Sequence, residues 1–210
     1  MTNISSGYIL NYSIFLDRLG IMKNQTDVRV LKTKEKLNKA LRSLLAEKGI
    51  SDITVNEICD RAGIRRATFY KHYSDKIAFM SGVASDLIYS LDNMLKASGT
   101  SLGAQDFLVE YEKKLIFCLL ENKYTGEFLR DNKTVGVVAS VMVHEHCEFL
   151  KSKLTEITNS GVELVASADV VASVLSGGIA SLMIKCYDDA EGMGDSIFSE
   201  IENIVRAMFR

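Results

Sequence analysis

Residues 54–76 read TVNEICDRAGIRRATFYKHYSDK, and this stretch decides the fold. Thr54 and Glu57 have the spacing of a capping box, which predicts a short helix over residues 55–62. Gly63 predicts a tight turn after it, because glycine adopts backbone conformations that other residues avoid. These signals indicate the first half of a helix-turn-helix.

The second half of the stretch predicts another short helix, over residues 65–73. Ser74 is expected to be the N-cap of a longer helix over residues 75–96. On the short helix, Phe69 and Tyr73 are four residues apart and therefore share the face that packs inward. Two short helices joined by a glycine turn are typical of a helix-turn-helix.

The outer face of the helix at 65–73 is basic and rich in hydroxyl groups. Ala67 keeps its bulk low, which allows a close approach to the major groove of DNA. Arginines at its N-terminal end lie where a helix-turn-helix places its reading residues. The helix N-termini at Thr54 and Ser74 are two further candidate anion sites. The candidate DNA-binding residues are Thr54, Arg65, Arg66, Thr68, Tyr70, Lys71, His72 and Lys76.

Charge is distributed unevenly along the chain. Residues 28–76 contain 12 Lys and Arg against 6 Asp and Glu, a net charge of +6, and the remaining 13 basic and 21 acidic residues give −8. A basic segment on an acidic body favours a local anionic partner such as double-stranded DNA. The alternative is an ordinary solvated surface.

Helical periodicity dominates the rest of the chain, which has no proline to interrupt long helices. A helix with a basic outer face is expected over residues 30–48, with Gly49 as its C-cap. Further helices are expected over residues 107–120, 134–154, 168–187 and 195–209, with breaks near Asn122, Asn159 and residues 192–194. The sequence therefore predicts an all-α protein.

Three segments are expected along the chain. Met22, which precedes the first strong helical pattern, is a candidate alternative translation start. The predicted segments are a flexible arm at 1–27, a three-helix DNA-binding domain at 28–76, and a helical ligand-binding and dimerisation domain at 77–210.

The stretch at 54–76 resembles the DNA-binding domain of TetR/AcrR-type transcriptional regulators, and the resemblance extends over about residues 30–91. Its motif is an aromatic residue, Tyr, any residue, His and a second aromatic residue, then a short polar joint and Lys. Arg65 stands where these regulators commonly have a serine or similar cap, and Ile77 replaces an acidic residue. The resemblance implies phosphate contacts by Tyr70, His72 and Lys76 and further DNA contacts by Thr54, Arg66, Thr68 and Lys71.

The end of the chain is similar to one subgroup of these regulators, over SGGIASLMIKCYDDAEGMGDSIFSEIENIV at 176–205. That similarity implies a homodimer whose interface is a four-helix arrangement of the last two long helices. Independently, residues 170–184 are apolar nearly all round, and Gly177 and Gly178 suit close backbone approach. We interpret this run as a buried helix, too short for a membrane span of about 20 residues. The expected interface residues are Leu175, Gly178, Ile179, Leu182, Ile197, Ile201, Ile204 and Val205, and the alternative is an ordinary monomer core.

The resemblance also implies a pocket for a small-molecule effector among the middle helices. Candidate lining residues are Tyr111, Phe117, Cys118, Met142, His144 and Cys147, with His146 beside them, although such residues also fit a plain core. The HEHC run at 144–147 places His144 and Cys147 three residues apart, a weak metal-binding pattern without an evident fourth ligand. We expect neither a metal nor a cofactor.

Four widely spaced cysteines and the lack of a basic N-terminal leader favour a cytoplasmic protein with reduced thiols. The sequence is interpreted as a DNA-binding transcriptional regulator, not an enzyme, that represses as a homodimer until a small molecule releases it. Two alternatives stay open. One is a DNA-binding protein that acts as a co-activator or through a protein partner without an effector, and the other is a metal-dependent enzyme built on His144 and Cys147.

Overall fold

The computed structural model describes residues 28–98, 102–121, 135–188 and 196–210. Within them the chain is helical, with no strand and one isolated bridge between Leu164 and Phe209, so the all-α prediction is confirmed. The predicted arm at 1–27, Met22, Asn122 and the break at 192–194 lie outside the described residues. In chain order, the elements are Val28–Leu45 (α2), the 3-10 turn Ile50–Asp52 (η2), Val55–Ala62 (α3), Arg66–Tyr70 (α4), Lys76–Ala97 (α5), Ala104–Glu121 (α6), Val135–Asn159 (α8), Ala168–Asp188 (α9) and Ser196–Ala207 (α10).

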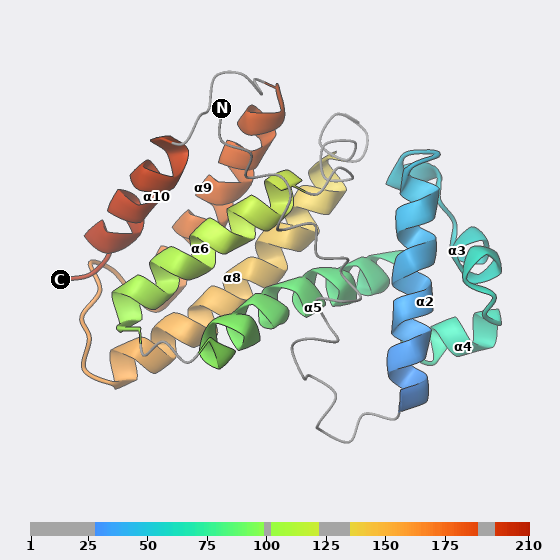
Figure 1. The fold of residues 1–210 in the computed structure, drawn as a ribbon, viewed down its shortest axis with the longest axis horizontal. Coiled ribbons are helices and arrows are strands. Elements are labelled where there is room, and N and C mark those ends of the chain that lie inside the picture. Colours follow the sequence, from blue (N-terminus) through green and yellow to red (C-terminus); the bar gives the residue numbers. More distant parts are fainter. Residues whose placement is uncertain (1–27, 99–101, 122–134, 189–195) are drawn as a thin grey trace.

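The N-terminal helices α2, α3 and α4 form a small unit at one end of the molecule (Figure 1). Its core is aromatic around Phe69, whose ring centroid lies 5.6 Å from that of Tyr73 and 5.7 Å from that of Phe79. The unit's buried cluster continues along α5 to Ala84 and includes Val141 of α8. Residues on both sides of the predicted domain boundary between residues 76 and 77 therefore pack into the same core.

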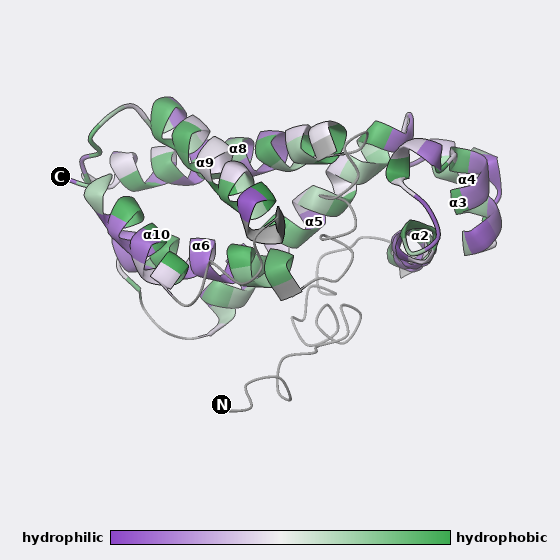
Figure 2. Cartoon of the chain, turned by 90° about the horizontal axis from the view of Figure 1, so that it is seen from above, coloured by the Kyte–Doolittle hydropathy of each residue, from purple (hydrophilic) through white to green (hydrophobic). Residues whose placement is uncertain are grey.

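The remaining helices form the body, in which α8 packs against both α9 and α5, and α6 packs against α10 (Figure 1). Tyr111 of α6 is fully buried there and stacks on Phe149 of α8 at 4.7 Å between ring centroids. In the view from above, α3 and α4 carry hydrophilic residues at the far end from this body (Figure 2). The long helix α5 joins the two parts.

The helix boundaries predicted from the sequence agree with the structure at α3 and differ from it at α4. The predicted range 55–62 of α3 is confirmed, and Gly63 ends it in the left-handed conformation at φ 63°. The next helix, α4, is shorter than predicted, because after Tyr70 the chain continues as a turn in which the His72 amide bonds to the Phe69 carbonyl.

Two predicted caps are wrong. Asp75, not Ser74, is the N-cap of α5: its Oδ1 accepts a hydrogen bond from the Ala78 amide at 2.8 Å, and the Ser74 hydroxyl donates to Asp75. Gly49 does not end α2 but precedes the turn η2 as its N-cap. A carboxylate binds amide groups more strongly than a hydroxyl does, which explains the choice at α5.

The apolar run at 170–184 lies in α9, where one face packs on α8 and the other is exposed. By length and hydropathy, residues Ala168–Lys185 would suffice for a membrane span, and a third of them are buried in this protein. The prediction of a buried helix therefore holds for one face only, because Val170 and Val174 are more than half exposed.

Candidate nucleic-acid interface

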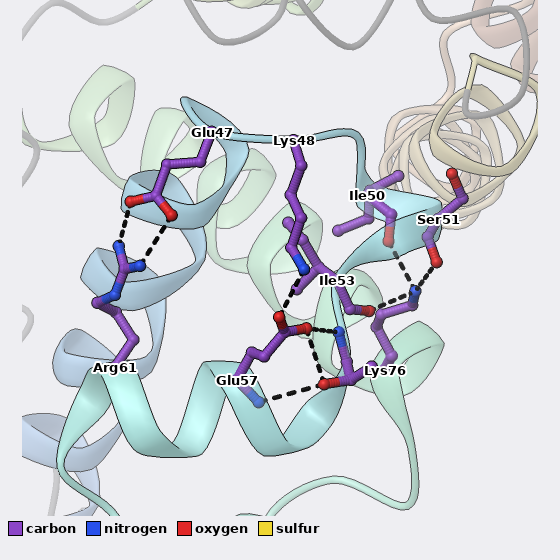
Figure 3. A network of polar contacts seen from close by, with 9 residues as sticks. Glu47, Lys48, Ile50, Ser51, Ile53, Glu57, Arg61 and Lys76 are labelled. Carbon is purple, nitrogen blue, oxygen red and sulfur yellow. Dashed lines mark hydrogen bonds and ion pairs between the residues drawn. The ribbon is translucent and has the colours of Figure 1, made fainter.

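The start of α3 is fixed by the predicted capping box, which the structure confirms (Figure 3). Thr54 Oγ1 accepts a hydrogen bond from the Glu57 amide, and Glu57 Oε2 accepts one from the Thr54 amide at 2.9 Å. Lys48 also donates to Glu57, and these bonds lower the pKa of the Glu57 carboxyl from 4.5 to about 2. The N-terminus of α3, which was predicted as an anion site, is thus already occupied by the Glu57 carboxylate. Thr54 caps this helix.

The helix α4 presents two distinct faces, as its spacing predicts. Phe69 and Tyr73 are buried against α5, and burial raises the pKa of Tyr73 to about 12. Tyr73 also lies close to Gly82 of α5, where a Cβ would come within 2.8 Å of its ring. The aromatic contacts therefore hold α4 on α5 in one orientation.

The outer face of α4 is basic and accessible. Arg65, Arg66, Ala67 and Lys71 are exposed, and the Tyr70 side chain is 47% exposed. The Arg66 guanidinium lies over the Tyr70 ring at 5.9 Å from its centroid, an arrangement that orients both side chains toward solvent together. Arg65 is the N-cap of α4, and its side chain makes no capping hydrogen bond to the helix. Thr68 and His72 are half-buried at the edges of this face.

Lys76 differs from its predicted role as a phosphate ligand. Its Nζ donates hydrogen bonds to the carbonyl oxygens of Ile50 at 2.7 Å, Ile53 at 2.8 Å and Ser51 at 3.3 Å (Figure 3). An ammonium group has three donors, so these three carbonyls occupy its full capacity. Burial lowers the pKa of Lys76, in keeping with its position inside the N-terminal unit. Lys76 therefore ties the start of α5 to the connection between α2 and α3, a contact that no local sequence pattern predicts.

A second link within the unit joins Arg61 of α3 to Glu47, which follows α2, with two guanidinium–carboxylate bonds of 2.7 and 2.9 Å (Figure 3). This pair raises the pKa of Arg61 and lowers that of Glu47. Together with Lys48 and Lys76, it shows that part of the basic excess of residues 28–76 has internal partners. Exposed basic side chains lie at α4 (Arg65, Arg66 and Lys71) and on α2 (Lys32, Lys36 and Lys39).

The residues predicted for a dimer interface separate into two sets. Leu175, Ile179, Ile197, Ile201 and Val205 are buried within the subunit's own core, which leaves little of their surface for a second copy. Within the subunit α10 packs on α6 and α9 packs on α8, which explains the burial of these residues. Gly178 and Ile204 are exposed and Leu182 is half-buried. Among the described side chains, the large apolar ones exposed on α9 and α10 are Val170, Val174 and Ile204.

The predicted effector pocket also changes in composition. A cavity of about 60 Å³ lies between α6, α8 and α9, and of the candidate lining residues Met142 and His146 are among those that line it. Tyr111 is fully buried in the core, Phe117 and His144 are exposed, and Cys118 and Cys147 pack elsewhere on the body. The lining residues are Leu115, Leu119, Val138, Ala139, Met142, Val143, His146, Ser176, Ile179, Ala180 and Met183.

The metal pattern at HEHC does not converge in the part of the chain that the structure describes, where no three His, Cys, Asp or Glu side chains come together. The Cys147 thiol instead lies 3.7 Å from the Ser173 hydroxyl. His146 is buried, with Nε2 at 3.3 Å from Glu112 Oε1.

A capped helix, a left-handed glycine turn and a short basic helix packed on a buried aromatic cluster define a helix-turn-helix DNA-binding protein. Residues 37–83 match the family model of the bacterial regulatory proteins of the tetR family. The chain is 47% identical over 173 residues to the HTH-type transcriptional regulator YxbF of Bacillus subtilis strain 168, an alignment covering 80% of this chain and 43% of YxbF. It is 31% identical over 74 residues to YvdT of the same strain, covering 35% of this chain and 37% of YvdT. The matching segments thus span less than half of either relative.

Solved structures share the fold along most of the chain. A TetR-family transcriptional regulator from Syntrophomonas wolfei superposes with a TM-score of 0.63 at 12% identity, covering 83% of this chain and 93% of that one. RolR in complex with resorcinol superposes with a TM-score of 0.60 at 19% identity, covering 88% and 90%. Residues 37–83 therefore match the DNA-binding domain of the tetR family, and the chain has the fold of TetR-family regulators, with an N-terminal helix-turn-helix and a helical C-terminal domain.

Proposed function

We propose that this chain is a transcriptional regulator, a homodimeric repressor that binds operator DNA through the outer face of α4 and leaves it when a small molecule binds the body. The observation that carries the DNA contact is the placement of Arg66, Tyr70 and Lys71 on one exposed face, held by the buried Phe69. Arginine and lysine reach phosphates and guanine edges, and tyrosine reaches phosphates. A repressor that binds chromosomal DNA works in the cytoplasm.

The test is binding of the full chain to duplex DNA from the region upstream of its own gene, measured at several salt concentrations. Lys71→Ala is expected to weaken binding and to reduce the salt slope by about 1, as for the loss of one phosphate contact. Lys151→Ala is the matched control, because Lys151 is an exposed lysine of the body that pairs with Asp169. Equal binding of both variants and the wild type would refute α4 as the reading helix.

Dimerisation is supported by the apolar residues that the last two helices leave at the surface. Val170, Val174 and Ile204 are 51%, 59% and 50% exposed, and a Cβ at Gly177 or Gly178 would meet nothing within 4 Å. These surfaces on α9 and α10 leave room for a second copy of the same helices. A dimer also suits an operator with two half-sites, which a two-fold symmetric protein reads together.

Light scattering after size-exclusion chromatography tests the dimer. Val174→Asp is expected to convert dimers to monomers, because it would bury an unpaired charge in the interface. Val165→Asp is the control, since Val165 is a similarly exposed valine, at 45%, that precedes α9. A wild type of monomer mass would contradict the proposal.

A further inference from the structure

The N-cap of the reading helix α4 is a residue whose side chain cannot cap it. Arg65 occupies this position, where Ser, Thr, Asp or Asn normally accepts a hydrogen bond from a backbone amide of the first turn. A guanidinium has donors only, and Arg65 makes no capping bond. Thr54 at α3 and Asp75 at α5 both accept such a bond. The reading helix therefore lacks a stabilising contact that both neighbouring helices have.

The backbone of Arg65 is nonetheless held in place. Its carbonyl oxygen accepts hydrogen bonds from the amides of Thr68 at 2.8 Å and Phe69 at 3.3 Å, and Phe69 is fully buried. Its φ of −68° and ψ of 140° are ordinary extended values, which any residue adopts without strain. The main chain at this position is therefore fixed by contacts that need no arginine, and the local structure gives no reason for this side chain.

The Arg65 guanidinium is free within the part of the chain that the structure describes. It makes no hydrogen bond, ion pair or ring contact there, and the residue is exposed. By contrast, the guanidinium of Arg61 is paired with the Glu47 carboxylate. That of Arg66 lies over the Tyr70 ring. Residues that break a local rule without a compensating contact are expected at functional sites, so Arg65 is expected to have a partner outside the chain.

The position and shape of the guanidinium define the chemistry of that partner. A helix-turn-helix places the N-terminal residues of its reading helix against base edges in the major groove. Ala67 is exposed beside Arg65, and its small side chain lets the groove approach closely. A guanidinium presents its donors as a planar fork, and the base edge that offers two neighbouring acceptors, N7 and O6, is that of guanine. Guanine is therefore the partner that fits both the place and the donors.

We propose that Arg65 reads one guanine in each operator half-site through its N7 and O6 atoms and determines base specificity at that position. This inference rests on the proposed function, in which α4 enters the major groove, and adds to it a base that the operator must contain. The residue that would stabilise α4 as its cap is replaced by one that binds DNA.

Selection from a library of randomised duplex DNA tests this role with the full-length chain. The wild type is expected to enrich duplexes that carry guanine at one fixed position of each half-site. Arg65→Ser is expected to lose discrimination against the other bases at that position alone, by roughly tenfold or more, as for one bidentate contact. Arg65→Gln is expected to prefer adenine there, because a glutamine amide forms the corresponding pair of hydrogen bonds with adenine.

A base analogue separates a contact to the base from a contact to a phosphate. In a selected duplex, 7-deazaguanine at the assigned position removes the N7 acceptor and leaves every phosphate in place. It is expected to weaken binding of the wild type roughly tenfold and binding of Arg65→Ser not at all. A phosphate contact would give a different result, in which Arg65→Ser weakens all sequences alike and reduces the salt slope by about 1, as expected for Lys71→Ala. That result would overturn the inference.

Urea unfolding supplies a readout that a structural role would move in the opposite direction. Serine can accept the capping hydrogen bond that arginine cannot, so the urea midpoint of Arg65→Ser is expected to equal or exceed that of the wild type. A lower midpoint with unchanged base preferences would give Arg65 a structural role and overturn the inference.

The selection also distinguishes a failure of this inference from a failure of the proposed function. If the wild type enriches a sequence and Arg65→Ser enriches it with the same preference at every position, α4 still reads DNA and only the role of Arg65 is wrong. If the wild type enriches no sequence, sequence-specific DNA binding is wrong, and the inference about Arg65 fails with it.

Discussion

Replacement of Lys76 by methionine separates a structural role of its ammonium group from a role as phosphate ligand. Methionine keeps an apolar stem of similar length but removes the donors to the carbonyls of Ile50, Ile53 and Ser51. A hydrogen bond from a charged donor contributes about 1.5 to 3 kcal/mol. The Ile50 carbonyl keeps the Ile53 amide as a donor, and water can reach the partly exposed site, so we expect a loss of about 2 kcal/mol in the free energy of unfolding rather than the sum of three bonds.

Urea unfolding followed by circular dichroism measures this loss directly. With an m-value of about 2 kcal/mol/M, the midpoint is expected to fall by about 1 M. The dependence of operator affinity on salt is measured on the same protein under folding conditions. Because the Lys76 ammonium already has three partners, the slope of log K against log salt concentration is expected to stay at its wild-type value.

Lys71→Met is the matched control, because Lys71 is an exposed lysine of the same unit. It should show the opposite pattern, with an unchanged urea midpoint and a salt slope reduced by about 1. The reasoning is refuted if Lys76→Met reduces the slope by about 1 and leaves the midpoint where it was. That result would mean that Nζ leaves the carbonyls and holds a phosphate when DNA binds.

Two further predictions concern the scaffold of the N-terminal unit. The folded-state pKa of Glu57 is about 2, below its ordinary 4.5, so its ionised form stabilises the fold above pH 4.5, and this contribution is lost as pH falls through about 2. The difference in free energy of unfolding between wild type and Glu57→Gln should therefore narrow between pH 4.5 and 2, in acid titrations followed by circular dichroism. A difference that stays constant over these pH values would contradict the lowered pKa of Glu57. Gly82→Ala brings a Cβ within 2.8 Å of the buried Tyr73 ring and should lower the free energy of unfolding by about 1 to 3 kcal/mol in thermal melts, whereas Gly136→Ala, with open space around it, should change it by less than about 1 kcal/mol.

The helix-turn-helix could be predicted from the sequence because its signals are local. The capping box of Thr54 and Glu57 and the turn at Gly63 involve residues within a few positions of one another, and the structure reproduces both. The inward face of α4 followed from the spacing of Phe69 and Tyr73 alone. The N-cap of α5 was predicted wrongly, because the adjacent residues Ser74 and Asp75 can both accept a hydrogen bond there and the structure has Asp75 as the cap.

The rest depended on contacts between distant segments. Lys76 bonds to carbonyls more than 20 residues away, and no spacing rule connects them. The cavity draws its walls from three helices, so Ser176 and Ala180 could not be grouped with Leu115 before the packing was known. Periodicity identified the apolar stripe of α10 but could not tell whether it faces the subunit's own α6 or a second copy.

The five-residue length of α4 has a consequence for regulation. A helix of this length is not stable in isolation, because nucleation is unfavourable and few hydrogen bonds repay it. Its orientation must come from Phe69 and Tyr73, which pack on Phe79 of α5. The same α5 packs against α8 in the body. A change in how α5 packs on α8 would therefore displace the basic face of α4 without unfolding any segment.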